Sequence, residues 1–237
     1  MHFMRLSPDI ESWWWVTERP SMQLLSVNVG FPQTVIWKGR VVTTGIFKAP
    51  VNGRVHMRRL NLDGDRQADL SVHGGADKAV YAYPCEHYTY WRGEFPGMEL
   101  PWGMFGENFT VAGLIEETVN IGDQFRIGSG VVMVTQPRVP CYKLAAKFGR
   151  EDIIKRFLAS GRSGFYCKVV QEGEVGAGDA IEAVSRDSHA ITVADVARLY
   201  NGQSDDFDLL QRAVRIEALP EGWRDYFQQK IAQRRRE

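Results

Sequence analysis

The segment "ETVNIGDQFRIGSGVVMVTQPRVPCYK", residues 117–143, decides the fold class. Its alternating apolar and polar runs are separated by the turns "IGDQ" and "GSG", a pattern typical of neighbouring β-strands. Similar runs occur on both sides of it, as "QLLSVNVG" (23–30), "RVVTTGIFK" (40–48), "GRVHMRRLNL" (53–62) and most of residues 163–185. Because these strands are short, numerous and joined by short turns, we expect a mainly β fold, a closed or partly closed barrel.

Two helices are expected to interrupt the strands. Pro84 suits the first position of a helix over "PCEHYTYWRGEF", residues 84–95. The second, "REDIIKRFLASG" over residues 150–161, has two acidic residues in its first turn and Gly161 as its C-cap.

After Ser185 the pattern becomes helical. The stretch "ITVADVARLY" has Thr192 three residues before Asp195, which predicts a capping box. Two more helices are expected over 204–219 and from Pro220 to the end, and the last places apolar residues four apart at Trp223, Phe227 and Ile231. Three helices this short cannot hold a core alone, so we expect them to pack together and on the barrel.

The chain has 237 residues, enough for one large domain and a small appendage. We therefore expect three parts: an N-terminal extension over residues 1–21, a barrel over 22–186, and three helices over 187–237. The extension contains three adjacent tryptophans, but its longest apolar run is too short for a secretory signal.

Composition excludes several classes of function. Twenty-nine basic residues balance twenty-nine acidic ones, which argues against broad nucleic-acid binding. No stretch approaches the ~20 apolar residues of a membrane span. The three cysteines are odd in number and none has CxxC spacing, so neither a disulfide framework nor a structural zinc site is expected. We expect a cytoplasmic protein with no nucleic-acid or membrane partner.

Cys141 is the first candidate for chemistry. Arg138 and Lys143 lie close to it in the sequence, and nearby cations stabilise a thiolate. Pro137 and Pro140 restrict the backbone, so the thiol is presented on a stiff loop after a strand. The local sequence fits equally well with a small buried residue at the rim of a barrel.

Cys85 is the alternative thiol, because the first turn of a helix lowers the pKa of a cysteine. Glu86 opposes that effect, and no cation is adjacent. Cys167 alternates with apolar neighbours in "GFYCKVV" and is expected in the core.

Other candidate groups are scattered. Gly74 and its neighbouring glycine could form an anion nest beside His73, although a plain turn in which His73 bonds a neighbouring carbonyl explains this segment better when it is taken alone. Glu107 and Asn108 interrupt an apolar run, and Lys48 stands where a strand is expected to end. The common nucleotide, zinc-protease and serine-hydrolase motifs are all missing.

Four segments together resemble the MOSC domain family, and its YiiM-like subgroup in particular: "GDRQADLSVHGGADKAVYAYP", "FGENFTVAGL", "IGDQFRIGSGVVMVTQPRVPCYK" and "VGAGDAIEAVS". The subgroup also has a C-terminal three-helix segment, which the end of this chain resembles. The resemblance covers roughly residues 22–235, and it rests on four weak motifs in the right order.

The resemblance implies a β-barrel that binds molybdenum cofactor, with Cys141 as the ligand of the metal. It implies a detoxifying oxidoreductase that reduces N-hydroxylated compounds, such as N-hydroxylaminopurine-type base analogues and hydroxylamines, to amines. Expected cofactor-binding residues are Lys48, His73, Gly74, Asn108, Arg138, Cys141 and Lys143. His73 or Glu107 would relay a proton, and the sequence does not choose between them.

Electrons must then come from a separate donor protein, a flavoprotein reductase or a ferredoxin-type protein, because the chain shows no motif for a redox group of its own. The helical tail either docks that donor or only seals the barrel. The alternative function is a non-catalytic cofactor carrier or a sulfur-transfer module using a Cys141 persulfide. A metal-free binding barrel, with Cys141 as packing, is the third reading.

Overall fold

The structure is a computed structural model that describes residues 21–68 and 74–236. Except for Ser21, the expected N-terminal extension lies outside these ranges. His73 also lies outside the described residues.

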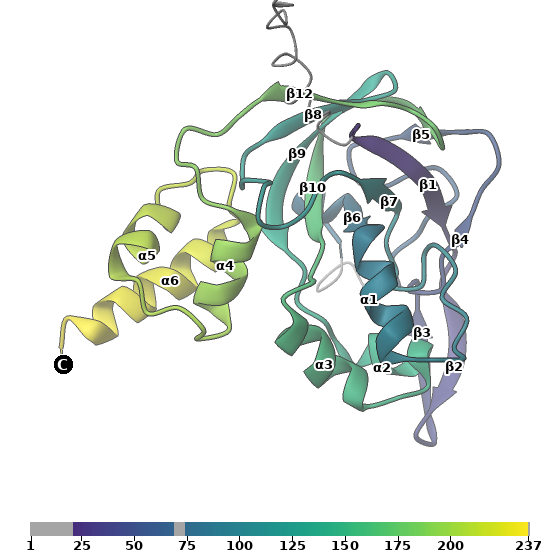
Figure 1. Cartoon of the computed structure of the whole chain (residues 1–237), viewed down its shortest axis with the longest axis horizontal. Helices are drawn as coiled ribbons and strands as arrows, with labels where there is room; N and C mark the ends of the chain where they lie inside the picture. Colours follow the sequence, from purple (N-terminus) through teal and green to yellow (C-terminus); the bar gives the residue numbers. More distant parts are fainter. Residues whose placement is uncertain (1–20, 69–73, 237) are drawn as a thin grey trace, which may run out of the picture.

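A mixed sheet of eight strands forms the body of the molecule (Figure 1). Their spatial order is β12-β8-β9-β10-β6-β7-β1-β4, and within this sheet β6 and β7 are parallel while the other neighbours are antiparallel. The strands are β1 Gln23–Val29, β4 Ala49–Pro50, β6 Val80–Pro84, β7 Phe109–Ala112, β8 Gln124–Ile127, β9 Gly130–Pro137, β10 Phe165–Gln171 and β12 Ile181–Ser185.

Two antiparallel strand pairs complete the β structure of the described residues. β2 (Gln33–Trp37) pairs with β3 (Arg40–Thr44), and β5 (Arg54–Met57) pairs with β11 (Gly173–Gly176). The mainly β prediction is confirmed, and the segment 117–143 does contain two adjacent strands, β8 and β9, joined by a tight turn.

Of the two expected forms, a closed or a partly closed barrel, the closed one is not present, because the sheet curls without closing. The edge of β1 that does not face β7 is divided between two partners. Its end pairs with the two residues of β4, while near its start Leu24 exchanges backbone hydrogen bonds with Gly178 and Asp179 at 2.7 and 2.9 Å. β12 reaches this edge only at its first residue, Ile181, whose amide donates to the Met22 carbonyl at 2.9 Å, so within the described ranges no continuous ladder joins β1 to β12.

Helices cover the outside of this sheet. Three helices lie around the aromatic cluster of Tyr83, Trp91 and Phe105: α1 (Glu86–Glu94), α2 (Tyr142–Phe148) and α3 (Asp152–Ser160). The 3₁₀ turn η1 (Ala76–Lys78) packs against β9 and β10. The two predicted helices correspond to α1 and α3, and Gly161 is the left-handed C-cap of α3. α2 was not predicted, since seven residues show too little periodicity.

The C-terminal helical segment lies beside the sheet, at the left of Figure 1, with α4 against β9. It contains α4 (Val193–Tyr200), α5 (Phe207–Ala213) and α6 (Glu221–Arg234). The predicted capping box is confirmed, because Thr192 and Asp195 bond each other's backbone amides at 3.0 Å. Phe227 is completely buried, and the hydrophobic core of the helices is continuous with that of the sheet.

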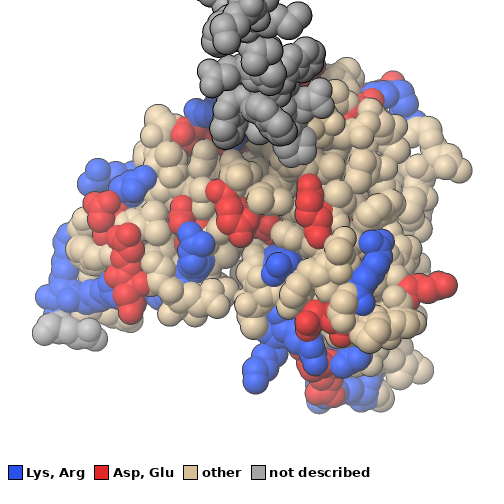
Figure 2. Space-filling view, in the orientation of Figure 1, with Lys and Arg blue, Asp and Glu red and all other residues tan. Residues whose placement is uncertain are grey.

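The surface is electrically mixed. Figure 2 shows Lys and Arg side chains beside Asp and Glu side chains on the visible face. Across residues 21–68 and 74–236, no helix is long and apolar enough to cross a membrane.

Candidate functional site

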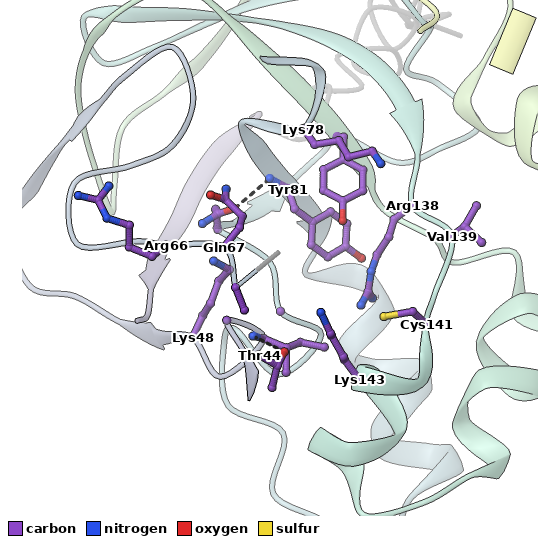
Figure 3. A pocket seen from close by; sticks show the side chains of 16 residues that line it. Thr44, Lys48, Arg66, Gln67, Lys78, Tyr81, Arg138, Val139, Cys141 and Lys143 are labelled. Atoms are coloured by element: carbon purple, nitrogen blue, oxygen red, sulfur yellow. Dashed lines mark hydrogen bonds between the residues drawn. The ribbon is translucent and has the colours of Figure 1, made fainter. Parts of the chain in front are cut away.

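A cationic pocket opens where the loop after β9 meets the loops around β3 and β6 (Figure 3). It encloses about 660 Å³, including its open mouth. Its walls come from six separate parts of the chain. The lining residues are Thr44, Gly45, Ile46, Lys48, Arg66, Gln67, Ala68, Lys78, Tyr81, Gly106, Asn108, Arg138, Val139, Cys141, Lys143 and Tyr166.

The backbone around Cys141 explains why a thiol reaches this pocket. β9 ends at Pro137, which has no N–H for a further ladder bond, and Pro140 keeps the loop extended. Cys141 itself is extended, with φ −123° and ψ 172°, and its carbonyl accepts the first hydrogen bond of α2 from Leu144. The predicted position of the thiol, on a loop after a strand, is confirmed, and the helix α2 that follows the loop was not predicted.

Arg138 is the buried cation beside this thiol. It is only 7% exposed, and its guanidinium carbon lies 4.9 Å from the centre of the Tyr81 ring and 5.3 Å from that of Phe157. Its Nη1 atom has no hydrogen-bond partner among the described residues. A buried donor left unsatisfied costs about 1–3 kcal/mol, and Figure 3 shows this guanidinium pointing towards the side of the pocket that holds Cys141.

Lys48 forms a buried ion pair with Asp65 at the opposite wall. Burial lowers the pKa of Lys48, and the charge of Asp65 opposes that shift. Asn108 fixes the arrangement, because its side-chain amide donates to Asp65 at 3.0 Å while its oxygen accepts from the Tyr81 amide at 3.1 Å. The lysine is therefore held at the wall by a dedicated carboxylate.

Five of the lining residues are lysines or arginines, and none of the described lining residues is acidic. Lys143 is nearly buried, and burial lowers the pKa of Lys78 in spite of Asp77. A pocket with this charge favours an anionic ligand, because the cations gain charge-assisted hydrogen bonds from it.

The structure brings together Lys48, Asn108, Arg138, Cys141 and Lys143, as the resemblance implied. Gly74 does not line this pocket; it lines a neighbouring groove that Cys141 also borders. His73 lies outside the described residues.

Glu107 stands apart from the pocket lining. It is fully buried, and its carboxylate accepts hydrogen bonds from the hydroxyls of Tyr88 and Thr110 and from the amides of Gly103 and Phe105. Burial raises its pKa. These four hydrogen bonds place Glu107 to hold the loop behind the pocket. Because its side chain does not line the pocket, its position does not support the expected role in proton relay.

Eleven of the sixteen lining residues were not predicted as site residues, and Arg66, Tyr81 and Tyr166 are among them. For Tyr166 a signal existed, since Cys167 was assigned to the core and neighbours in a strand face opposite ways. Tyr81 and Arg66 carried no such signal.

The other two cysteines lie outside the pocket. Burial, followed by the neighbouring charge of Glu86, raises the pKa of Cys85 to about 11, which opposes thiolate formation. Cys167 is buried in the core, as expected, and burial raises its pKa as well. Over the described ranges, no group of three or more His, Cys, Asp or Glu side chains could hold a metal ion.

Comparison with known families gives two matches. The MOSC domain family matches residues 69–182, and the YiiM-like 3-alpha helix domain matches residues 191–234. The chain is 44% identical over 207 residues to YflK of Bacillus subtilis (strain 168), covering 87% of this chain and 93% of that protein. It is 38% identical over 182 residues to protein YiiM of Escherichia coli (strain K12), covering 76% and 81%.

A more distant relative carries the name reductase. This protein of Gibberella moniliformis (strain M3125 / FGSC 7600) is 32% identical over 181 residues, which are 75% of this chain and 32% of that longer protein. Among solved structures, YiiM from Geobacillus stearothermophilus is similar with a TM-score of 0.75 and 36% identity, over 89% of this chain and 99% of that one.

Proposed function

This chain belongs to the MOSC family, in its YiiM-like subgroup, and from that premise we propose that it is a molybdenum-cofactor-binding oxidoreductase that reduces N-hydroxylated compounds to amines. The observation that carries the proposal is the pairing of one thiol with five cations in a single pocket. The name of the distant fungal relative, a reductase, agrees with this class of activity.

The residues present fit such a cofactor. A thiolate is a soft donor, so Cys141 suits a metal whose other ligands are dithiolene sulfurs. The pterin phosphate needs hydrogen-bond donors with positive charge, and the buried Nη1 of Arg138 lacks a partner among the described residues. Lys48 and Lys143 add positive charge to the same pocket.

When bound, the cofactor would supply the two electrons that cleave the substrate N–O bond. With two protons, R–NHOH becomes R–NH₂ and water. The chain would bind and orient both partners and exclude competing reactions. Burial raises the pKa of Tyr166, so this pocket phenol keeps its proton on Oη at neutral pH.

We propose that the electrons arrive from a separate protein, a flavoprotein reductase or a ferredoxin-type donor. The described cysteines are dispersed, with Cys85 at the N-cap of α1, Cys141 in the pocket and Cys167 in the core. An iron–sulfur cluster needs several thiolates close together.

The test is to produce the protein in cells that make molybdenum cofactor, and to measure bound molybdenum and N-hydroxylaminopurine reduction with an artificial electron donor. Cys141→Ala should lose most of the metal and the activity. Cys85→Ala is the matched control and should keep both, because that thiol lies outside the pocket.

Equal molybdenum content and activity in wild type and Cys141→Ala would refute the thiolate ligand. Bound molybdenum without reduction of any N-hydroxylated compound would instead favour a cofactor carrier. A persulfide on Cys141, detected by mass spectrometry of the intact protein, would favour sulfur transfer.

A further inference from the structure

A second hollow, the aromatic groove, lies on the other side of Cys141 from the cationic pocket. It runs between η1 and the C-terminal helices and shares Lys78, Val139, Cys141 and Tyr166 with the pocket. It encloses about 1480 Å³, including its open side. A group held by the Cys141 sulfur would therefore be reachable from this groove.

One wall of the groove consists of three aromatic side chains from the helical segment. Tyr200 ends α4, and Trp223 and Tyr226 lie on the first turns of α6. The Tyr200 ring centre lies 4.8 Å from that of Trp223 and 5.2 Å from that of Tyr226. All three rings keep accessible surface, and Tyr200 is 36% exposed.

Small residues keep the space beside these rings open. A Cβ added at Gly222 would meet no atom within 4 Å, and the same holds for Gly75 on the facing wall. That facing wall also carries polar groups, from Asp77 and Lys78 of η1 and from Gln136 near the end of β9. The groove thus combines ring faces on one side with hydrogen-bonding groups on the other.

We propose that Tyr200, Trp223 and Tyr226 form the specificity-determining wall for the substrate, holding the flat face of a heteroaromatic ring while its N–OH group points towards Cys141. This inference rests on the proposed function and gives the C-terminal helices a part in it. Aromatic side chains stack on any planar base because every base has a π-face, and each stacked base contributes ~1–3 kcal/mol. Gln136 and the η1 side chains supply partners for ring nitrogens.

The competing explanation is that these rings serve packing alone, since Trp223 and Tyr226 also touch the core. The two explanations differ in one respect. A packing role affects every substrate equally, whereas a stacking wall affects only substrates that have a ring.

The experiment compares two substrates of the molybdenum-loaded protein, 6-N-hydroxylaminopurine and N-methylhydroxylamine. Tyr226→Leu and Tyr200→Leu keep an apolar side chain and remove the ring. Each should lower kcat/KM for the purine about 10-fold and leave that for N-methylhydroxylamine unchanged. Tyr142→Leu is the control, because this ring is 55% exposed and lines neither hollow.

A second readout is independent of turnover. Equilibrium dialysis with N6-methyladenine, which has the purine ring but no N–O bond to reduce, should show binding to the wild type, about 10-fold weaker binding to the two variants, and no change in Tyr142→Leu. Molybdenum content and circular dichroism, measured on every variant, establish that each is loaded and folded.

The inference is overturned if the wild type binds no analogue, or if both substrates lose the same factor, or if neither is affected. Failure of the proposed function looks different: a loaded wild type that reduces neither compound. In that case analogue binding and its loss in Tyr226→Leu still decide whether the aromatic wall holds flat rings.

Discussion

At the scale of single residues, Asp65 is the carboxylate that organises the cationic pocket. It is fully buried and binds three separate segments: the Lys48 ammonium, the Gly30 amide at 3.1 Å and the Asn108 side chain at 3.0 Å. It stands behind the lining and does not enter the pocket itself. The buried Asp65 carboxylate thus holds the Lys48 ammonium at the pocket wall without lining the pocket itself.

The first prediction concerns this carboxylate. Asp65→Asn leaves the buried Lys48 without its counter-ion, so the free energy of unfolding should fall by about 3 kcal/mol. Urea denaturation measures it. Asp63→Asn is the matched control, because Asp63 pairs with Arg58 at the surface, where solvent screens the charges, and its loss should change the free energy of unfolding much less. Equal losses in the two variants would contradict a buried pair.

The second prediction concerns Lys147, whose ammonium donates to the carbonyls of Ile46 and Gly103 beneath the pocket. Burial lowers its pKa to about 8, with Glu107 opposing the shift, whereas a lysine in an unfolded chain titrates near 10.4. Between these values the unfolded state binds more protons, so this group makes stability rise with pH.

Lys147→Met should remove that rise. From about pH 7.5 to about pH 9.5, the unfolding free energy of the wild type should gain about 2 kcal/mol relative to the variant. Urea midpoints at the two pH values measure it. Lys155→Met, at an exposed position of α3, should follow the wild type. A constant difference between wild type and Lys147→Met would show that Lys147 keeps its ordinary titration.

At the scale of elements, the loop before β7 shows what the sequence could and could not predict. Glu107 and Asn108 were both expected as site residues, Glu107 for proton relay and Asn108 for cofactor binding. In extended backbone, however, neighbouring side chains face opposite ways. Asn108 accordingly lines the pocket, while Glu107 lies behind it. The sequence showed that two polar residues interrupt an apolar run. It could not show which of them lines the pocket, because that depends on the register of β7 with β1 and β6.

The C-terminal helices were the best predicted elements, because their signals are local. The capping box at Thr192 and the four-residue spacing along α6 need only nearby residues to be read. α2, by contrast, gave no local signal in the sequence. It begins directly after the extended backbone at Cys141. That Tyr200 and Trp223 would border the groove was not readable, since it depends on how α4 docks beside β9.

The third prediction concerns this docking. Phe227 of α6 is fully buried in the core that the helices share with the sheet, so Phe227→Ala should cost about 3–5 kcal/mol. Hydrogen exchange read by mass spectrometry in increasing urea follows peptides of α6 and peptides around Trp91 separately. Both should lose protection together, at a lower urea concentration than in the wild type. Earlier loss in α6 alone would mean that the helical segment unfolds separately.

At the scale of the whole molecule, composition and strand spacing predicted a β-rich body with a helical tail, and both are present. Closure of the barrel was not predictable in the same way. It depends on whether β1 finds one long partner or two short ones, and strands distant in sequence settle that choice. The pocket has the same origin, because Lys48, Asn108 and Cys141 meet only after the sheet has curled.

The divided edge of β1 also sets the order in which this protein can fold. The side chain of Gln23 binds the carbonyl of Gly178, 155 positions along the chain, and the backbone at Leu24 binds the same turn. During synthesis, β1 leaves the ribosome long before these partners exist, and its other partners, β4 and β7, are made earlier. Contacts so distant in sequence slow folding, because a large loop must close before they form. The seam between the two ends of the sheet is therefore expected to be the last part of the body to assemble.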